Sequence, residues 1–120
     1  MNFTDLNIWK EANKLAISIY KITQTFPKSE IFGIISQLQR ASTSISANIA
    51  EGFGRKGNKE FIQFLYQSKG SLYETQNFIL FSQDIGYIEK SQAKALLDQY
   101  ESLAKMLNSF ITKVKYNNDQ

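Results

Sequence analysis

Residues 89–115 read EKSQAKALLDQYESLAKMLNSFITKVK, and the spacing within this stretch decides the fold class. Its apolar residues recur in alternating steps of three and four, at Ala93, Leu96, Tyr100, Leu103, Leu107, Ile111 and Val114. Such steps place side chains along one stripe of an α-helix, whereas a strand would alternate every two residues. The opposite side carries charged residues such as Lys94, Asp98 and Glu101, which predicts a solvated face. The stretch therefore predicts one long amphipathic helix.

Three earlier segments repeat this spacing. Their apolar stripes run from Trp9 to Phe26, from Ile31 to Gly52 and from Phe61 to Ile79. Short breaks containing proline or glycine separate the segments, and Ser29 and Asn58 are candidate N-caps. Helices are therefore expected at residues 6–26, 30–53, 59–83 and 89–115. Long helices joined by short connections predict an all-α, up-down antiparallel four-helix bundle, formed as a single domain over residues 1–120.

The composition excludes several classes of function. Among 120 residues there is no cysteine and no histidine, which removes disulfides, thiolate nucleophiles, zinc-thiolate sites and the Glu-x-x-His ligands of di-iron bundles. We therefore expect no catalytic residue, no metal and no cofactor, and a protein that is not an enzyme. No basic leader with a long apolar run is present, so we expect a cytoplasmic protein with no membrane partner.

Two sets of basic residues could bind phosphate. Lys10, Lys14, Lys21 and Lys28 fall within about 40° of one another on the first predicted helix. They form either a lysine-rich solvated face or a row of phosphate contacts. The net charge of +3 comes from twelve lysines and two arginines against eleven acids, which is compatible with nucleic acid without being diagnostic of it.

The second set surrounds a glycine-rich segment. Residues 52–57 spell G-x-G-x-x-G, but a helix rather than a strand precedes them, so the context of a dinucleotide site is missing. The segment is better interpreted as a helix C-cap followed by a turn. Arg55, Lys56 and Lys59 still flank the N-terminus of the third helix, where free N–H groups favour an anion.

The middle two helices carry more apolar surface than one core requires. The side of the second helix opposite its stripe holds small residues, among them Ala47 and Ala50. The third helix adds a second row beside its stripe, formed by Ile62, Tyr66, Tyr73 and Leu80. This surface is either the rim of one broad core or a contact between protomers, and we expect a homo-oligomer.

Polar residues near the end of the second helix are expected to organise structure rather than chemistry. Asn48 lies at the border of the core stripe, so we expect it to form a hydrogen bond across the bundle. Glu51 should find a cation, and Arg55 follows it by four residues, which is the favourable order for a helical ion pair. Gly52 belongs to the same structural group.

Residues 37–55 read QLQRASTSISANIAEGFGR, and this run resembles the four-helix-bundle proteins encoded in intervening sequences of bacterial 23S rRNA genes. Asp5-Leu6 with Trp9-Lys10, and Lys59-Glu60-Phe61 with Gly70-Ser71-Leu72, resemble the first and third helices of that family. The resemblance implies a ring-shaped homo-oligomer, a pentamer. Members commonly carry a second arginine where this chain has Gln39, which would weaken the basic patch.

Relatives of that family include the accessory protein of diversity-generating retroelements, which binds nucleic acid and a reverse transcriptase. Our leading hypothesis is a non-enzymatic homo-oligomer that binds nucleic acid, RNA in particular, through its backbone. The candidate contacts are Lys10, Lys14, Lys21, Arg40, Arg55, Lys56 and Lys59. The alternative is a protein–protein adaptor or scaffold with no nucleic-acid role, whose partner could be a protein such as a reverse transcriptase.

Overall fold

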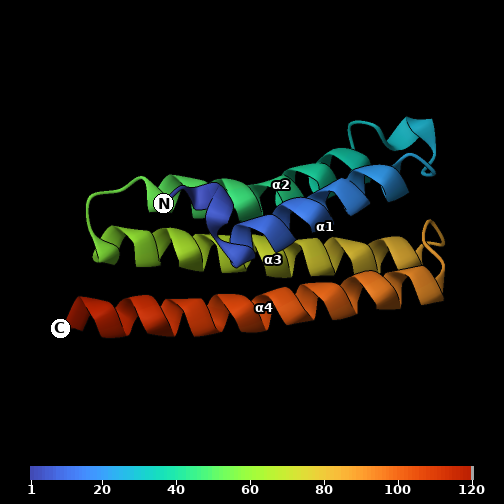
Figure 1. Cartoon of the computed structure of the whole chain (residues 1–120). Coiled ribbons are helices and arrows are strands. Elements are labelled where there is room, and N and C mark those ends of the chain that lie inside the picture. Colours follow the sequence, from blue (N-terminus) through green and yellow to red (C-terminus); the bar gives the residue numbers. More distant parts are fainter. Residues whose placement is uncertain (120) are drawn as a thin grey trace.

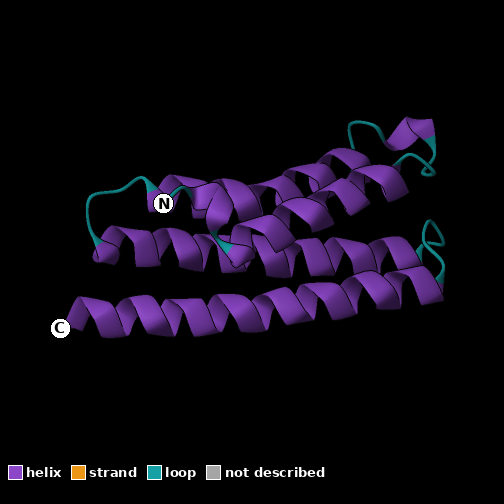
Figure 2. Cartoon of the chain, in the orientation of Figure 1, coloured by secondary structure: helices purple, strands orange, loops and turns teal. Residues whose placement is uncertain are grey.

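The structure is a computed structural model that describes residues 1–119. Its helices run alternately up and down, and each packs against two neighbours to form an elongated bundle (Figure 1). Between the helices, the described residues contain only loops and turns (Figure 2). The predicted all-α, up-down antiparallel bundle is confirmed. The elements are η1 Phe3–Asp5, α1 Asn7–Thr23, η2 Lys28–Glu30, α2 Ile34–Phe53, α3 Asn58–Asp84 and α4 Lys90–Asp119.

The predicted stripe of α4 is buried along its whole length, from Ala93 to Val114. In α1 to α3 the stripes are buried as well, although Trp9 and Phe61 are only half-buried. The largest fully buried side chain is Tyr100, whose hydroxyl has no hydrogen-bond partner among residues 1–119. Because burial disfavours the charged phenolate, it raises the pKa of Tyr100 well above its ordinary value.

The connection between α1 and α2 differs from the prediction. α1 ends at Thr23 rather than 26, and α2 begins at Ile34 rather than 30. Hydrogen bonds between them span only three residues, such as Glu30 N–H to the Pro27 carbonyl, so the segment forms a 3-10 turn. Ser29 therefore lies inside η2 and caps no α-helix, and Ile31, expected in the core, is 56% exposed.

A contact with the other loop at this end of the bundle accompanies the turn. The Tyr87 hydroxyl donates a 2.7 Å hydrogen bond to the Glu30 carboxylate, and the ring of Tyr87 lies 5.3 Å from that of Phe26. This hydrogen bond raises the pKa of Tyr87, with smaller contributions from burial and from the negative charge of Glu30. The hydrogen bond and the ring contact thus join the α1–α2 connection to the α3–α4 loop.

α2 and α3 pack closely at Gly52. A Cβ atom placed on Gly52 would lie 2.6 Å from the Phe64 Cβ and 2.9 Å from the Phe61 Cδ1, so no larger residue fits without displacement. At the start of α3 the cap position is Gly57, and Asn58 is the first helical residue rather than the predicted N-cap. Because Gly52 has no side chain, the backbone of α2 can pack directly against the Phe61 ring of α3.

The helices differ in length, and this difference leaves part of the bundle open. α4 runs to Asp119, four residues beyond the predicted end, and has 30 residues against 17 in α1. At 1.5 Å per residue these lengths are about 45 Å and 26 Å. The N-terminal segment containing η1 packs on α1 and α2 rather than on α4. The C-terminal part of α4 therefore extends past the start of α1 without a fourth helix beside it (Figure 1).

Candidate nucleic-acid and subunit interfaces

The outer face of α1 carries three of the predicted phosphate contacts. Lys10, Lys14 and Lys21 are exposed, and none takes part in the ion pairs found among the described residues, which are Glu51–Arg55 and Lys94–Asp98. Lys28 was expected in the same strip but belongs to η2, because α1 ends at Thr23. Ile17, half-exposed, lies between the lysines on this face. The α1 face is thus basic with one apolar residue in its middle.

The second basic set lies at the α2–α3 connection. Arg55, Lys56 and Lys59 are all exposed. Arg55 donates a 2.9 Å hydrogen bond to Glu51, as predicted, and its guanidinium lies 4.9 Å from the centre of the Phe64 ring. These two contacts orient Arg55, whereas Lys56 and Lys59 have no ion-pair partner within residues 1–119.

Arg40 does not join the basic set around Arg55. The two arginines are fifteen residues apart in sequence, which is about 22 Å along the helix axis. A 3.2 Å hydrogen bond from Gln39 Nε2 to Thr23 Oγ1 fixes the register between α2 and the antiparallel α1. Arg40 is therefore level with the C-terminal end of α1, while Lys10 is level with the C-terminal end of α2. The basic residues follow both helices along the bundle rather than gathering at one point.

The two predicted interface rows lie on different helices, the tyrosine row on α3 and the small row on α2. Tyr66, Tyr73 and Leu80 are close to half-exposed, and the Tyr66 hydroxyl accepts a 2.6 Å hydrogen bond from Lys115 of α4. The flank of α3 that faces α2 instead carries Ser68 and Ser71, which bond to α2 residues. Tyr66 and Ser71 are about 140° apart around α3. The tyrosine row therefore borders α4.

The row of small residues lies on the outside of α2, away from the tyrosine row. Ala47 is exposed and Ala50 is half-buried. Ile62, which was assigned to the tyrosine row, is half-buried against the protomer's own core. Exposed Tyr20 and Phe32 were missed by the sequence reasoning. Tyr20 could have been found from its position on the outer face of α1, whereas the exposure of Phe32 depends on the 3-10 turn.

The hydrogen bond expected from Asn48 across the bundle is not formed among the described residues. Its side-chain nitrogen donates to the Ser44 carbonyl at 2.8 Å and to the Ser44 hydroxyl at 3.0 Å, so both hydrogen bonds stay within α2. Ser44 lies one turn earlier, where a side chain can bond to the backbone and hydroxyl of its own helix. The link between helices comes instead from Ser71, whose hydroxyl lies 3.0 Å from that of Ser44. Glu51 is exposed in the protomer and pairs with Arg55, the cation that follows it by four residues.

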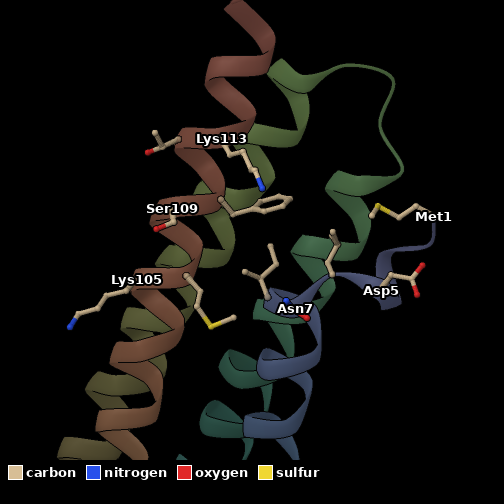
Figure 3. Close-up of a pocket in the computed structure, with 11 residues that line it drawn as sticks. Met1, Asp5, Asn7, Lys105, Ser109 and Lys113 are labelled. Atoms are coloured by element: carbon tan, nitrogen blue, oxygen red, sulfur yellow. The ribbon is translucent and has the colours of Figure 1, made fainter.

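A groove of about 830 Å³ lies where α1 begins beside α4 (Figure 3). Leu6, Ile8, Met106 and Phe110 supply its apolar lining, and Lys113 extends over it. The Phe110 ring packs edge-on against Phe61 of α3, 5.8 Å away. Its remaining lining residues are Met1, Asp5, Asn7, Lys105, Ser109 and Thr112.

Neither a metal cluster nor a membrane span is found in the part of the chain that the structure describes. No three acidic side chains there lie close enough together to hold a metal ion. None of the helices in this part is both long enough and apolar enough to cross a bilayer.

The sequence model of one protein family, described as 23S rRNA-intervening sequence protein, matches residues 4–109. This chain belongs to that family. A crystal structure of a protein of unknown function from the S23 ribosomal protein family of Bacteroides thetaiotaomicron has a similar fold, with a TM-score of 0.77. The two chains are 24% identical, and the alignment covers 87% of this chain and 97% of the other. No curated protein matches the chain. The resemblance drawn from residues 37–55 is confirmed.

In this intervening-sequence protein, the segment that carries the family resemblance forms α2 and the start of the following loop. Gln39 stands in place of the second arginine that the resemblance leads one to expect. Here its amide bonds to Thr23 and so ties α2 to α1, which is a structural role. Gly52, near the other end of the segment, permits the close approach to α3. Much of the segment therefore serves packing between helices.

Proposed function

We propose that this intervening-sequence protein is a non-enzymatic homo-oligomer that binds RNA through its phosphate backbone. The observation that carries the proposal is the outer face of α1, where Lys10, Lys14 and Lys21 are exposed and free of ion pairs. Lysine contacts to phosphate give affinity without reading sequence. Arg40 and Arg55 add further positive charge beside α2. Arg40 is level with the C-terminal end of α1, and Arg55 is level with its N-terminal end.

The proposed oligomer is a ring in which unlike surfaces meet. A closed ring of more than two subunits needs two different patches on each protomer, whereas a two-fold dimer can use one patch twice. The tyrosine row beside α4 and the small row on the outside of α2 are two such patches on separate flanks of the protomer. Small residues let a neighbouring helix approach closely, and tyrosines supply the large contact area typical of interfaces.

Reversing the charge of the α1 face is expected to weaken RNA binding strongly. The variant Lys10→Glu/Lys14→Glu/Lys21→Glu should bind a generic single-stranded RNA about 100-fold more weakly at low salt, and its salt slope should fall by about two. Affinity is measured by fluorescence anisotropy at two or more salt concentrations, with DNA of the same sequence in parallel. Because all three side chains are exposed, the fold should survive, as circular dichroism would confirm.

The matched control is Lys90→Glu/Lys94→Glu/Lys105→Glu, which makes the same change in net charge on α4. It should lose far less affinity than the α1 variant. Equal losses in the two variants would mean that only net charge matters. An α1 variant that binds as tightly as the parent would remove the phosphate row and leave the adaptor function in the lead.

The ring can be tested with one variant in each patch. Ala47→Glu and Tyr73→Glu should each turn the oligomer into a monomer at micromolar concentration, measured by light scattering on a sizing column. Mixed together, they should form dimers containing one of each, because every mixed pair keeps a single intact contact. Gln67→Glu, on the exposed outer side of α3 between the patches, is the control and should leave the assembly unchanged. A monomeric parent protein would contradict the proposal.

A further inference from the structure

The groove beside α4 occupies the place that a longer α1 would fill. α1 begins partway along α4, since Asn7 and Ile8 line the groove together with α4 residues between Lys105 and Lys113. From Ser109 to the end of α4 is about 16 Å of helix, or three turns, that α1 does not cover. α3 continues along this length, where Tyr66 bonds to Lys115 and Phe61 packs on Phe110, so the open position lies beside both α3 and α4.

The lining of the groove matches an amphipathic helix. Its apolar part comes from Leu6, Ile8, Met106 and Phe110, and Leu6 and Ile8 are already buried by the protomer itself. Met106 and Phe110 are half-buried, so additional apolar surface could still be removed from water there. Met106 adds a flexible side chain that adapts to different occupants. Such a surface suits the apolar stripe of a helix laid into a groove.

The charges around the groove favour an acidic occupant. Lys113 extends over the groove in Figure 3 and has no ion-pair partner within residues 1–119. The N-terminus of α1 also opens here: its cap, Leu6, makes no side-chain hydrogen bond, and its first turn holds no acidic residue. The N–H groups of Asn7, Ile8 and Trp9 accordingly have no acceptor among the described residues. The one carboxylate of the lining, Asp5, is turned away from Lys113 and accepts from the Asn2 N–H.

From this geometry we infer that the groove docks an acidic amphipathic helix of a partner protein. The partner helix extends the line of α1, with its apolar stripe on Met106 and Phe110 and its carboxylates beside Lys113 and the α1 N-terminus. This contact is separate from the lysine face of α1 and does not require RNA binding. A second copy of this chain is a poorer occupant, because the protein carries a net charge of +3.

The two methionines make the inference directly testable, because Met1 and Met106 both line the groove and the chain has no others. The full chain, labelled with 13C at the methionine methyl groups, is titrated with a synthetic helical peptide that bears a leucine stripe and glutamates elsewhere. The Met106 methyl signal should shift, with a dissociation constant in the micromolar range. A peptide with lysine in place of every glutamate should bind at least about tenfold more weakly, and the variant Lys113→Glu should reverse that preference.

Lys90→Glu, an exposed charge reversal at the other end of α4, is the matched control and should leave both affinities nearly unchanged. The inference is wrong if the acidic peptide causes no shift at millimolar concentration, or if both peptides bind equally well. It is also overturned if dilution of the protein alone shifts Met106, which would identify a second copy as the occupant. A Met106 shift on addition of RNA would assign the groove to nucleic acid instead.

Discussion

Replacing Gly52 with alanine is expected to destabilise the fold by about 1–3 kcal/mol, although alanine is the better helix former. The added Cβ would lie 2.6 Å from the Phe64 Cβ, an atom fixed next to the α3 backbone, so a helix must shift to make room. For a domain of this size the melting temperature should fall by about 4 °C for each kcal/mol. Differential scanning calorimetry of the parent and the variant measures the change.

Gly70→Ala is the matched control for this prediction. Gly70 is exposed within α3, and a Cβ placed there meets no atom within 4 Å. The same substitution should therefore stabilise the protein, by up to about 1 kcal/mol, through helix propensity alone. If Gly52→Ala melts at or above the temperature of the parent, the close packing of α2 on α3 is not a constraint on the fold.

Tyr100 is expected to make the protein lose stability in alkali. Burial raises the pKa of Tyr100 above the ordinary value of 10.0, so the folded state keeps the proton at a pH where the unfolded state releases it. The contribution is fully present below pH 10 and decreases as the pH rises further, by about 1.4 kcal/mol per pH unit. Urea unfolding between pH 8 and pH 12 should show this loss.

In the variant Tyr100→Phe, the free energy of unfolding should not show this decrease above pH 10. It also removes a buried hydroxyl that has no partner among the described residues, so at pH 7 its stability should equal or exceed that of the parent. Tyr116→Phe, the same change at an exposed position, controls for the loss of a tyrosine elsewhere. Parallel stability curves for the parent and Tyr100→Phe above pH 10 would show that Tyr100 ionises freely in the folded protein.

The long helices could be predicted because their signal is local and repeated. The stripe of α4 sets its buried face, and every residue of that stripe is buried in the structure. The turn around Ile31 could not be predicted in this way. Its conformation is accompanied by the contact of Glu30 with Tyr87, which is 57 residues away in sequence, and spacing within a segment contains no information about such a contact.

The surfaces could be predicted only in part for the same reason. The 3.6-residue period is enough to place Lys10, Lys14 and Lys21 on an outer face. It does not say which neighbour each flank of α3 meets, so the separation of the two interface rows required the structure. Asn48 could form hydrogen bonds within α2 or to another helix, and the spacing of residues does not distinguish between these partners. The groove depends on how far α1 and α4 extend past each other, which their separate patterns do not specify.

The order in which the helices pack also bears on how the chain folds. Each helix packs on the next one along the sequence, and the contact between α1 and α4 joins the two helices that are farthest apart in the chain. Proteins whose contacts are mostly local have low contact order and fold within microseconds to milliseconds. The α1–α4 contact must close the longest loop of the chain, and α1 covers only part of α4. The groove therefore lies on the side of the bundle where α1 meets α4, and forming this contact has the largest entropic cost of loop closure.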